Sequence, residues 1–139
     1  MTITEVQNEI IDEFAMFDDW TERYEYIIEL GKSLPIIDEK YKTDENLIKG
    51  CQSKVWLNAQ QKNDKVVFTA DSDAILTKGI IAIMIRVFSN QSPQDILEAS
   101  TDFVDEIGLK EHLSPTRANG LVSMIKQIKM YALAFQAKN

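Results

Sequence analysis

Hydrophobic residues recur three or four positions apart near the start of the chain, which is the spacing of one face of a helix. Residues 3–16 carry this pattern, and an amphipathic helix is predicted there. A second helix is expected to begin after Asp19, with Glu22 three residues further on as in a capping box, and to end near Gly31 or Pro35. Its expected buried stripe consists of Trp20, Tyr24, Ile27 and Ile28.

In the middle of the chain the apolar residues recur at every second position, which is the spacing of one face of a β-strand. Residues 53–60 alternate between apolar and polar, and after a turn at 62–64 the apolar residues of 66–70 mark one face of a second segment. This pattern predicts an antiparallel hairpin that follows an irregular connection, residues 35–50. Because two strands alone are marginally stable, we expect helices packed on the sheet or a third strand, for which 46–49 is a weak candidate.

The segment after the hairpin is the most apolar part of the chain. A helix capped by Asp71 or Ser72 is predicted over 75–88, and because it is apolar nearly all round it should be the central buried helix. Two helices, a hairpin and then several helices predict an α+β fold, a small antiparallel sheet flanked by helices. A length of 139 residues favours one domain, residues 1–139, with a single core.

Two serine–proline pairs, Ser92-Pro93 and Ser114-Pro115, predict the starts of later helices. Serine caps a helix through its hydroxyl group, and proline suits the first helical position. A short helix is expected between them, around Phe103, Val104 and Ile107. The buried stripe of the last helix is expected to be Leu121, Met124, Ile125, Ile128 and Ala132.

Charge and hydropathy narrow the range of partners. The chain has 15 lysines and arginines against 22 acidic residues, and its formal net charge of −7 opposes the phosphate neutralisation that nucleic-acid binding requires. The N-terminus lacks the basic start and apolar run of a signal peptide. The most apolar window, 75–88, is too short to span a bilayer. We therefore expect a cytoplasmic protein that binds neither nucleic acid nor membrane.

Cys51 is the only cysteine of the chain, so it cannot form an intramolecular disulfide, and one thiol suits a reducing compartment. A free cysteine is most often a packed, buried residue. Cys51, however, follows Gly50 at a loop-to-strand junction, where reactive groups tend to be displayed. Lys49 and Lys54 are near enough to favour the thiolate, which is the nucleophilic form. On these grounds a packed residue and a reactive sulfur both remain open.

His112 and Arg117 are the other candidates for chemistry. His112 is the single histidine and the one imidazole available to a cysteine hydrolase, although nothing in its spacing orients it toward a thiol. Arg117 lies in the first turn of a predicted helix, where a cation opposes the helix dipole. It is either a contact for a thiolate or an anionic partner group, or a solvated arginine paired with a nearby acid. No glycine-rich phosphate loop or metal-binding cluster is evident in the sequence.

Several sequence blocks together resemble the SufE family of iron–sulfur biogenesis proteins. The most specific block comprises Gly50-Cys51, Ser53 and Val55-Trp56, preceded by Asn46 and Ile48. The other blocks, in the family's order, are Trp20, Arg23-Tyr24, Ile27-Ile28, Leu30-Gly31, Asp71-Ser72-Asp73-Ala74, Lys78-Gly79, Leu113-Ser114-Pro115-Thr116-Arg117 and Asn119-Gly120-Leu121. They extend over nearly the whole chain, and only the cysteine block would be specific by itself.

The resemblance implies a fold shared with IscU-type scaffold proteins and a role as sulfur acceptor and activator of a cysteine desulfurase of the SufS or CsdA type. Cys51 would receive the sulfane sulfur as a persulfide and pass it to an iron–sulfur cluster scaffold such as SufBCD. In the family this cysteine lies on a loop and can be sheltered until the partner docks. Arg117 would lie near that loop and support it. Pyridoxal phosphate would belong to the partner, and this chain would bind no cofactor or metal.

Three alternatives are kept. A CsdE-like paralogue would carry the same cysteine but route sulfur to another pathway, such as tRNA modification. A cysteine hydrolase would use Cys51 with His112, turn over without a partner and lose activity on His112→Ala. A non-catalytic interaction domain would keep its function on Cys51→Ser. On the leading hypothesis the protein is a sulfur carrier that stimulates a desulfurase rather than a free-standing enzyme.

Overall fold

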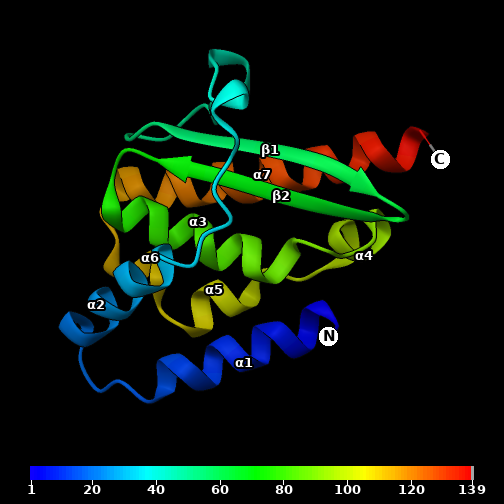
Figure 1. The fold of residues 1–139 in the computed structure, drawn as a ribbon. Helices are drawn as coiled ribbons and strands as arrows, with labels where there is room; N and C mark the ends of the chain where they lie inside the picture. Colours follow the sequence, from blue (N-terminus) through cyan, green and yellow to red (C-terminus); the bar gives the residue numbers. More distant parts are fainter. Residues whose placement is uncertain (139) are drawn as a thin grey trace.

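The structure is a computed structural model, and it describes residues 1–138. Its architecture is α+β, with a two-stranded antiparallel sheet lying on helices (Figure 1), as the sequence predicts. The helices are α1 (Ile3–Ala15), α2 (Trp20–Gly31), α3 (Ile75–Phe88), α4 (Pro93–Glu98), α5 (Asp102–Glu106), α6 (Leu109–His112) and α7 (Pro115–Lys138). The strands are β1 (Val55–Lys62) and β2 (Lys65–Ser72), preceded by the 3-10 turns η1 (Glu39–Tyr41) and η2 (Asp44–Asn46).

The two strands pair along their whole length, from Val55 opposite Ser72 to Lys62 opposite Lys65. Within residues 1–138 the sheet has no third strand, and the candidate segment 46–49 contributes a single bridge from Leu47 to Trp56. Helices packed on the sheet supply the stability that a third strand would have given. The inward-facing strand residues that are fully buried are Val55, Leu57, Val66, Phe68 and Ala70.

The other face of the sheet is partly covered by the segment 36–47, which crosses it and leads into the Cys51 loop (Figure 1). Lys42 fixes this segment to the sheet, because its ammonium group lies 2.9 Å from an Asp71 carboxylate oxygen and 5.0 Å from the centre of the Trp56 ring. These contacts of Lys42 therefore fix the position of the segment that leads to the start of β1.

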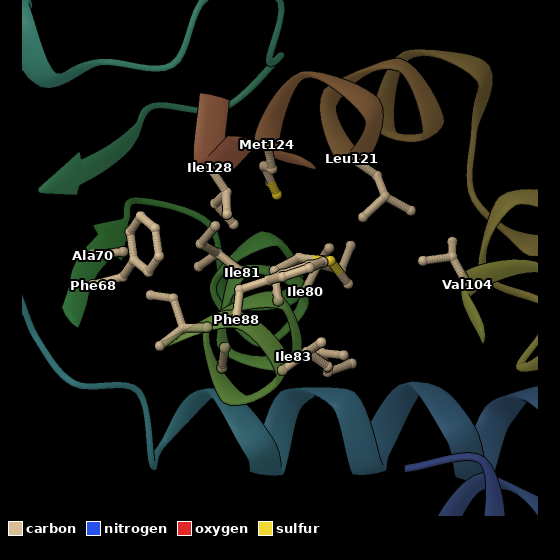
Figure 2. Close-up of a cluster of buried hydrophobic side chains, with 14 of the residues drawn as sticks. Phe68, Ala70, Ile80, Ile81, Ile83, Phe88, Val104, Leu121, Met124 and Ile128 are labelled. Carbon is tan, nitrogen blue, oxygen red and sulfur yellow. The ribbon is translucent and has the colours of Figure 1, made fainter. Parts of the chain in front are cut away.

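The core is centred on α3, whose residues from Ile80 to Phe88 are buried almost without exception. In Figure 2 the α7 side chains of Leu121, Met124 and Ile128 point toward α3. The predicted central helix is thus confirmed. The predicted stripe of α7 is buried as well, apart from the partly exposed Ile125.

Two glycines allow α2 and α3 to cross closely. A Cβ atom on Gly79 would lie 2.1 Å from the Ile27 carbonyl oxygen, and one on Gly31 would lie 3.1 Å from the Gly79 nitrogen. Side chains at these positions would push the two helices apart. The close crossing fixes the beginning of α3 next to the C-terminal half of α2.

The predicted cap of α3 is wrong. The helix begins at Ile75 with Ala74 as its N-cap, because β2 continues through Ser72. The Asp71 side chain forms ion pairs with the Lys42 and Lys78 side chains and does not cap the backbone of the helix. The two predicted caps, Asp71 and Ser72, instead pair with β1 as the last residues of β2.

The other helix starts agree with the sequence. Asp19 accepts a hydrogen bond from the Glu22 amide at 2.8 Å, and Ser92 caps α4. Ile28, expected in the buried stripe of α2, is instead 37% exposed. The short helix α6 has no counterpart in the sequence prediction. Among residues 1–138, no helix combines the length and apolarity needed to cross a membrane.

Candidate functional site

Cys51 lies on the short loop between η2 and β1, and hydrogen bonds fix both ends of this loop. On the entering side the Ile48 amide donates to the Val55 carbonyl oxygen at 2.8 Å. On the leaving side the Lys54 amide donates to the Asp73 carboxylate at 3.0 Å, and the Asp73 amide donates to the Lys54 carbonyl oxygen at 3.3 Å. The loop is therefore tied both to its own strand and to the residues just before α3.

Gly50 gives the loop its shape. Its φ angle of 91° is in the region that favours glycine. A Cβ atom at this position would lie 2.7 Å from the Ser123 hydroxyl oxygen on α7. The φ angle favours glycine here, and a Cβ atom would displace the Ser123 hydroxyl group.

The Cys51 thiol is half-buried against α7. Its Sγ atom lies 3.7 Å from the Gly120 carbonyl oxygen, to which the thiol donates. A Cβ atom on Gly120 would be 3.4 Å from the same sulfur, so the bare backbone of α7 makes room for it. The hollow at this point has a volume of about 10 Å³, close to the minimum for one water molecule. Its lining consists of Cys51, Gln52, Ser53, Thr77, Ile80, Arg117, Gly120 and Met124.

Burial raises the pKa of the Cys51 thiol. Lys49 and Lys54 are exposed and do not offset this effect. The expectation that these lysines favour the thiolate is therefore not met in the isolated protein. Because the thiolate is the nucleophile, burial makes the sulfur less nucleophilic in this conformation.

Arg117 lies at the rim of the same hollow as Cys51. It belongs to the first turn of α7, where its amide donates to the Ser114 hydroxyl oxygen at 3.3 Å, so the predicted serine cap is formed. Its side chain is exposed. Two residues that are 66 positions apart in sequence thus line the same hollow.

His112 belongs to a different cluster. Its ring stacks on Trp20 with 3.8 Å between ring centres, and its Nδ1 atom lies 3.0 Å from the Gly108 carbonyl oxygen. It is not among the described residues that line the hollow at Cys51. The geometry gives the cysteine hydrolase hypothesis no base in contact with the sulfur.

Thr77 and Met124 complete the lining from α3 and α7, and no sequence signal singles them out. Both lie on apolar helix faces and look like ordinary core positions. Gly120 belongs to one of the blocks that resemble the SufE family. The structure shows its role, which is to leave room on α7 for the Cys51 sulfur. Within residues 1–138, no three His, Cys, Asp or Glu side chains gather in a way that could hold a metal ion.

The fold and site define an α+β domain that holds a lone cysteine on a loop over a helix. The model of the SufE family, described as an Fe-S metabolism associated domain, matches residues 8–132. The chain belongs to the SufE family and is a SufE-like protein of Fe–S metabolism.

Two relatives support the assignment. The chain is 44% identical to an uncharacterized SufE-like protein of Rhizobium meliloti, over 90% of this chain and 93% of that protein. It is 38% identical to SufE-like protein 1, chloroplastic/mitochondrial, of Arabidopsis thaliana, over 94% of this chain but 35% of that longer protein.

A solved structure shows the same fold. It is the solution structure of a hypothetical protein from Thermus thermophilus, with a TM-score of 0.77 over 93% of this chain and 94% of that chain. The sequence identity is 18%, so this likeness concerns the fold alone.

Proposed function

We propose that this SufE-family protein accepts sulfur from a cysteine desulfurase of the SufS or CsdA type and activates that enzyme. The observation that carries the proposal is the position of Cys51, on a loop fixed at both ends, with its sulfur half-buried against Gly120 and Arg117 at the rim. A sulfur carrier needs one thiol, a resting place for it, and a means of exposing it when the donor arrives.

The chemistry is a thiol exchange. The Cys51 thiolate attacks the outer sulfur of the donor's persulfide, and a new sulfur–sulfur bond forms on Cys51. The bond between the donor's two sulfurs breaks, and its electron pair leaves with the donor cysteine as a thiolate. The proton on the outer sulfur is retained, so no external oxidant or reductant is needed.

Burial of the thiol suits the resting state. A protonated, half-buried sulfur reacts slowly with small oxidants, because oxidation follows thiolate character and exposure. Docking of the donor would lift the loop from α7 and lower the pKa of the thiol. Sulfur transfer would therefore begin only after the donor has docked.

Arg117 supports the loop in this proposal. Arg117 is exposed and lines the hollow, and its guanidinium group would stabilise the thiolate or the negative charge of the persulfide once the loop moves. The sulfur would then pass to a scaffold of the SufBCD type. The alternative route, toward tRNA modification as in a CsdE-like paralogue, uses the same chemistry at Cys51.

The decisive experiment mixes this protein with a cysteine desulfurase, pyridoxal phosphate and cysteine, and measures intact mass. Wild type should gain one sulfur, and Cys51→Ser should gain none. His112→Ala should gain sulfur as the wild type does. If wild type gains no sulfur from SufS-type or CsdA-type enzymes, the proposed function is wrong.

A further inference from the structure

Thr77, which lines the hollow at Cys51 from α3, is a buried polar residue without a hydrogen-bond partner. Two polar side chains of residues 1–138 are buried, Gln7 and Thr77, and Thr77 is 5% exposed. The Gln7 amide group donates to the Ser100 carbonyl oxygen at 2.8 Å. Among the side-chain hydrogen bonds of residues 1–138, by contrast, none involves the Thr77 hydroxyl group.

The Thr77 hydroxyl group opens into the hollow. Every fully enclosed side-chain nitrogen or oxygen of residues 1–138 has a hydrogen-bond partner. Since the Thr77 hydroxyl oxygen has none, it is not fully enclosed, and the small exposed part of this residue lines the hollow at Cys51. An unpartnered hydroxyl group in such a place costs free energy that a valine of the same shape would avoid. The hollow therefore favours a ligand atom that accepts a hydrogen bond.

The backbone at the beginning of α3 has a matching polarity. No side chain caps this helix, and its first backbone hydrogen bond runs from the Lys78 amide to the Ala74 carbonyl oxygen at 2.9 Å. The amides of Ile75, Leu76 and Thr77 therefore have no partner within the helix. The positive end of the α3 dipole lies in the turn that carries Thr77, and it favours negative charge beside that residue.

The Cys51 thiol does not use the Thr77 hydroxyl group in the resting state. Its Sγ atom lies 3.7 Å from the Gly120 carbonyl oxygen on α7, to which the thiol donates. Gln52 and Ser53, the other neutral polar residues of the lining, belong to the Cys51 loop and would move with it. Thr77 belongs to the central buried helix and stays in place when the loop moves. Its hydroxyl group is thus available to a second atom bonded to the Cys51 sulfur.

A second sulfur atom on Cys51 has the chemistry that this place favours. A persulfide is a stronger acid than the parent thiol, and once its outer sulfur is negative it accepts hydrogen bonds from hydroxyl groups. The hollow holds about 10 Å³, which is room for one water molecule and less than a sulfur atom needs. Room for the outer sulfur therefore appears only when the Cys51 Sγ atom leaves the Gly120 carbonyl oxygen.

Positive charge outweighs negative charge around the hollow. Among the described residues that line it, Arg117 from α7 is the only charged one, and the exposed Lys49 and Lys54 lie on the Cys51 loop. Asp73, just before α3, is the acidic residue bonded to this loop, and its carboxylate already accepts a hydrogen bond from the Lys54 amide at 3.0 Å. These surroundings stabilise a negative sulfur more than a neutral one.

We infer that the hollow is the binding place for the outer sulfur of a Cys51 persulfide, with the Thr77 hydroxyl group as its hydrogen-bond donor. The inference rests on the proposed function, because it assigns the place that the carried sulfur occupies after transfer. When the Cys51 Sγ atom leaves the Gly120 carbonyl oxygen, the outer sulfur takes the freed space beside Thr77. Thr77 thus holds the carried sulfur and takes no part in breaking or forming the sulfur–sulfur bond.

The test loads Cys51 with sulfur chemically, without a desulfurase, so that its result does not depend on the donor. The Cys51 thiolate attacks an aromatic disulfide, forms a mixed disulfide and releases one aromatic thiolate. Hydrosulfide then attacks the Cys51 sulfur, the bond to the aromatic sulfur breaks, and its electron pair leaves with a second aromatic thiolate. The product carries one added sulfur on Cys51, which intact mass verifies.

Thr77→Val removes the hydroxyl group and keeps the shape of the side chain, whereas Thr77→Ser keeps the hydroxyl group. The matched control is Thr69→Val, at a threonine of β2 that lines a different hollow. Valine suits a strand as well as threonine does. For each loaded protein, the rate at which iodoacetamide alkylates the outer sulfur is measured against pH, and the midpoint of this profile reports the pKa of the persulfide.

For loaded Thr77→Val the midpoint should rise by about one pH unit, because the hydrogen bond to the negative sulfur is lost. Loaded Thr77→Ser and Thr69→Val should stay within about 0.3 unit of wild type. In the unloaded proteins the thiol is directed to the Gly120 carbonyl oxygen. The midpoint of Cys51 alkylation should therefore be the same in unloaded Thr77→Val and unloaded wild type.

The outcomes separate this inference from the proposed function. An unchanged midpoint in loaded Thr77→Val would overturn the binding place and leave the proposed function intact. An equal rise in loaded and unloaded Thr77→Val would show that Thr77 acts on the Cys51 sulfur rather than on the carried sulfur, which also overturns the inference. If wild type takes no sulfur from a desulfurase but the loaded variants differ as expected, the proposed function is wrong and the binding place stands.

Discussion

Gly50 and Ser123 meet at the base of the Cys51 loop, and a side chain on Gly50 would have to displace the Ser123 hydroxyl group. The Ser123 hydroxyl oxygen would lie 2.7 Å from a Cβ atom there, whereas the Ser123 Cβ atom would be at an ordinary 3.6 Å. The loop and α7 are thus fitted to each other at the residue before the reactive sulfur.

Gly50→Ala should loosen the loop for two separable reasons, the clash with Ser123 and the φ angle of 91°. We expect a loss of about 1–3 kcal/mol in stability and faster alkylation of Cys51 by iodoacetamide. Adding Ser123→Ala removes the clashing oxygen and should restore part of the loss. No recovery in the double variant would show that backbone strain alone is responsible.

The raised pKa of the Cys51 thiol predicts a pH dependence of stability. The folded protein holds this proton more tightly than the unfolded chain, so the contribution is fully present below the unfolded pKa, about 8.5. It is lost as pH rises through the folded pKa. Urea unfolding of wild type and Cys51→Ala from neutral to alkaline pH should show the difference between them shrinking. A difference that grows with pH would contradict the prediction.

Arg117 should favour anionic reagents at Cys51. In wild type, the alkylation rate with iodoacetate relative to neutral iodoacetamide should exceed that of Arg117→Gln by about two- to fivefold at low salt. Lys126→Gln, an exposed cation on the same helix, serves as the control. If both variants change the ratio equally, the effect comes from net charge and Arg117 has no particular position relative to the sulfur.

His112→Ala should affect stability and leave chemistry unchanged. Loss of the stacked Trp20 contact should cost about 0.5–1.5 kcal/mol, measured by chemical denaturation. Sulfur loading of Cys51 should remain within about twofold of wild type. A loss of loading greater than the loss of folded protein would bring the cysteine–histidine hypothesis back.

Gly79→Ala should be far more disruptive than Gly31→Ala. The added Cβ atom would lie 2.1 Å from a main-chain oxygen at Gly79 but 3.1 Å from the nearest atom at Gly31. We expect about 3 kcal/mol or more of destabilisation for the first and clearly less for the second. Similar thermal unfolding of the two variants would contradict the close crossing of α2 and α3.

Much of the fold could be predicted because it depends on periodicity and local capping. The hairpin, the buried helix α3 and the two serine–proline starts all have short-range causes in sequence. The cap of α3 could not be predicted from local sequence. Asp71 and Ser72 are residue types that cap helices well, but in the structure both belong to strand β2. Ile28 is exposed for a similar reason, because the direction of α2 is set by its glycine crossing with α3.

The site shows a similar division. Cys51 was selected by its uniqueness and its neighbour Gly50, which are visible in sequence. The meeting of Cys51 with Arg117 depends on how the loop folds onto α7. The sequence left a thiolate contact and a solvated arginine both open for Arg117, and the family resemblance favoured the first. The charge state of the thiol was the least predictable property. Sequence proximity of Lys49 and Lys54 suggested a thiolate, whereas burial decided the direction of the shift.

The hollow at Cys51 has room for about one water molecule, and a sulfur atom is larger than that. If Cys51 carries a persulfide, the added sulfur atom does not fit between the loop and α7 unless the Cys51 sulfur moves away from the Gly120 carbonyl oxygen. Empty and loaded proteins would then present different surfaces at the same place. A protein downstream could distinguish a full carrier from an empty one by shape, before any bond to sulfur is exchanged.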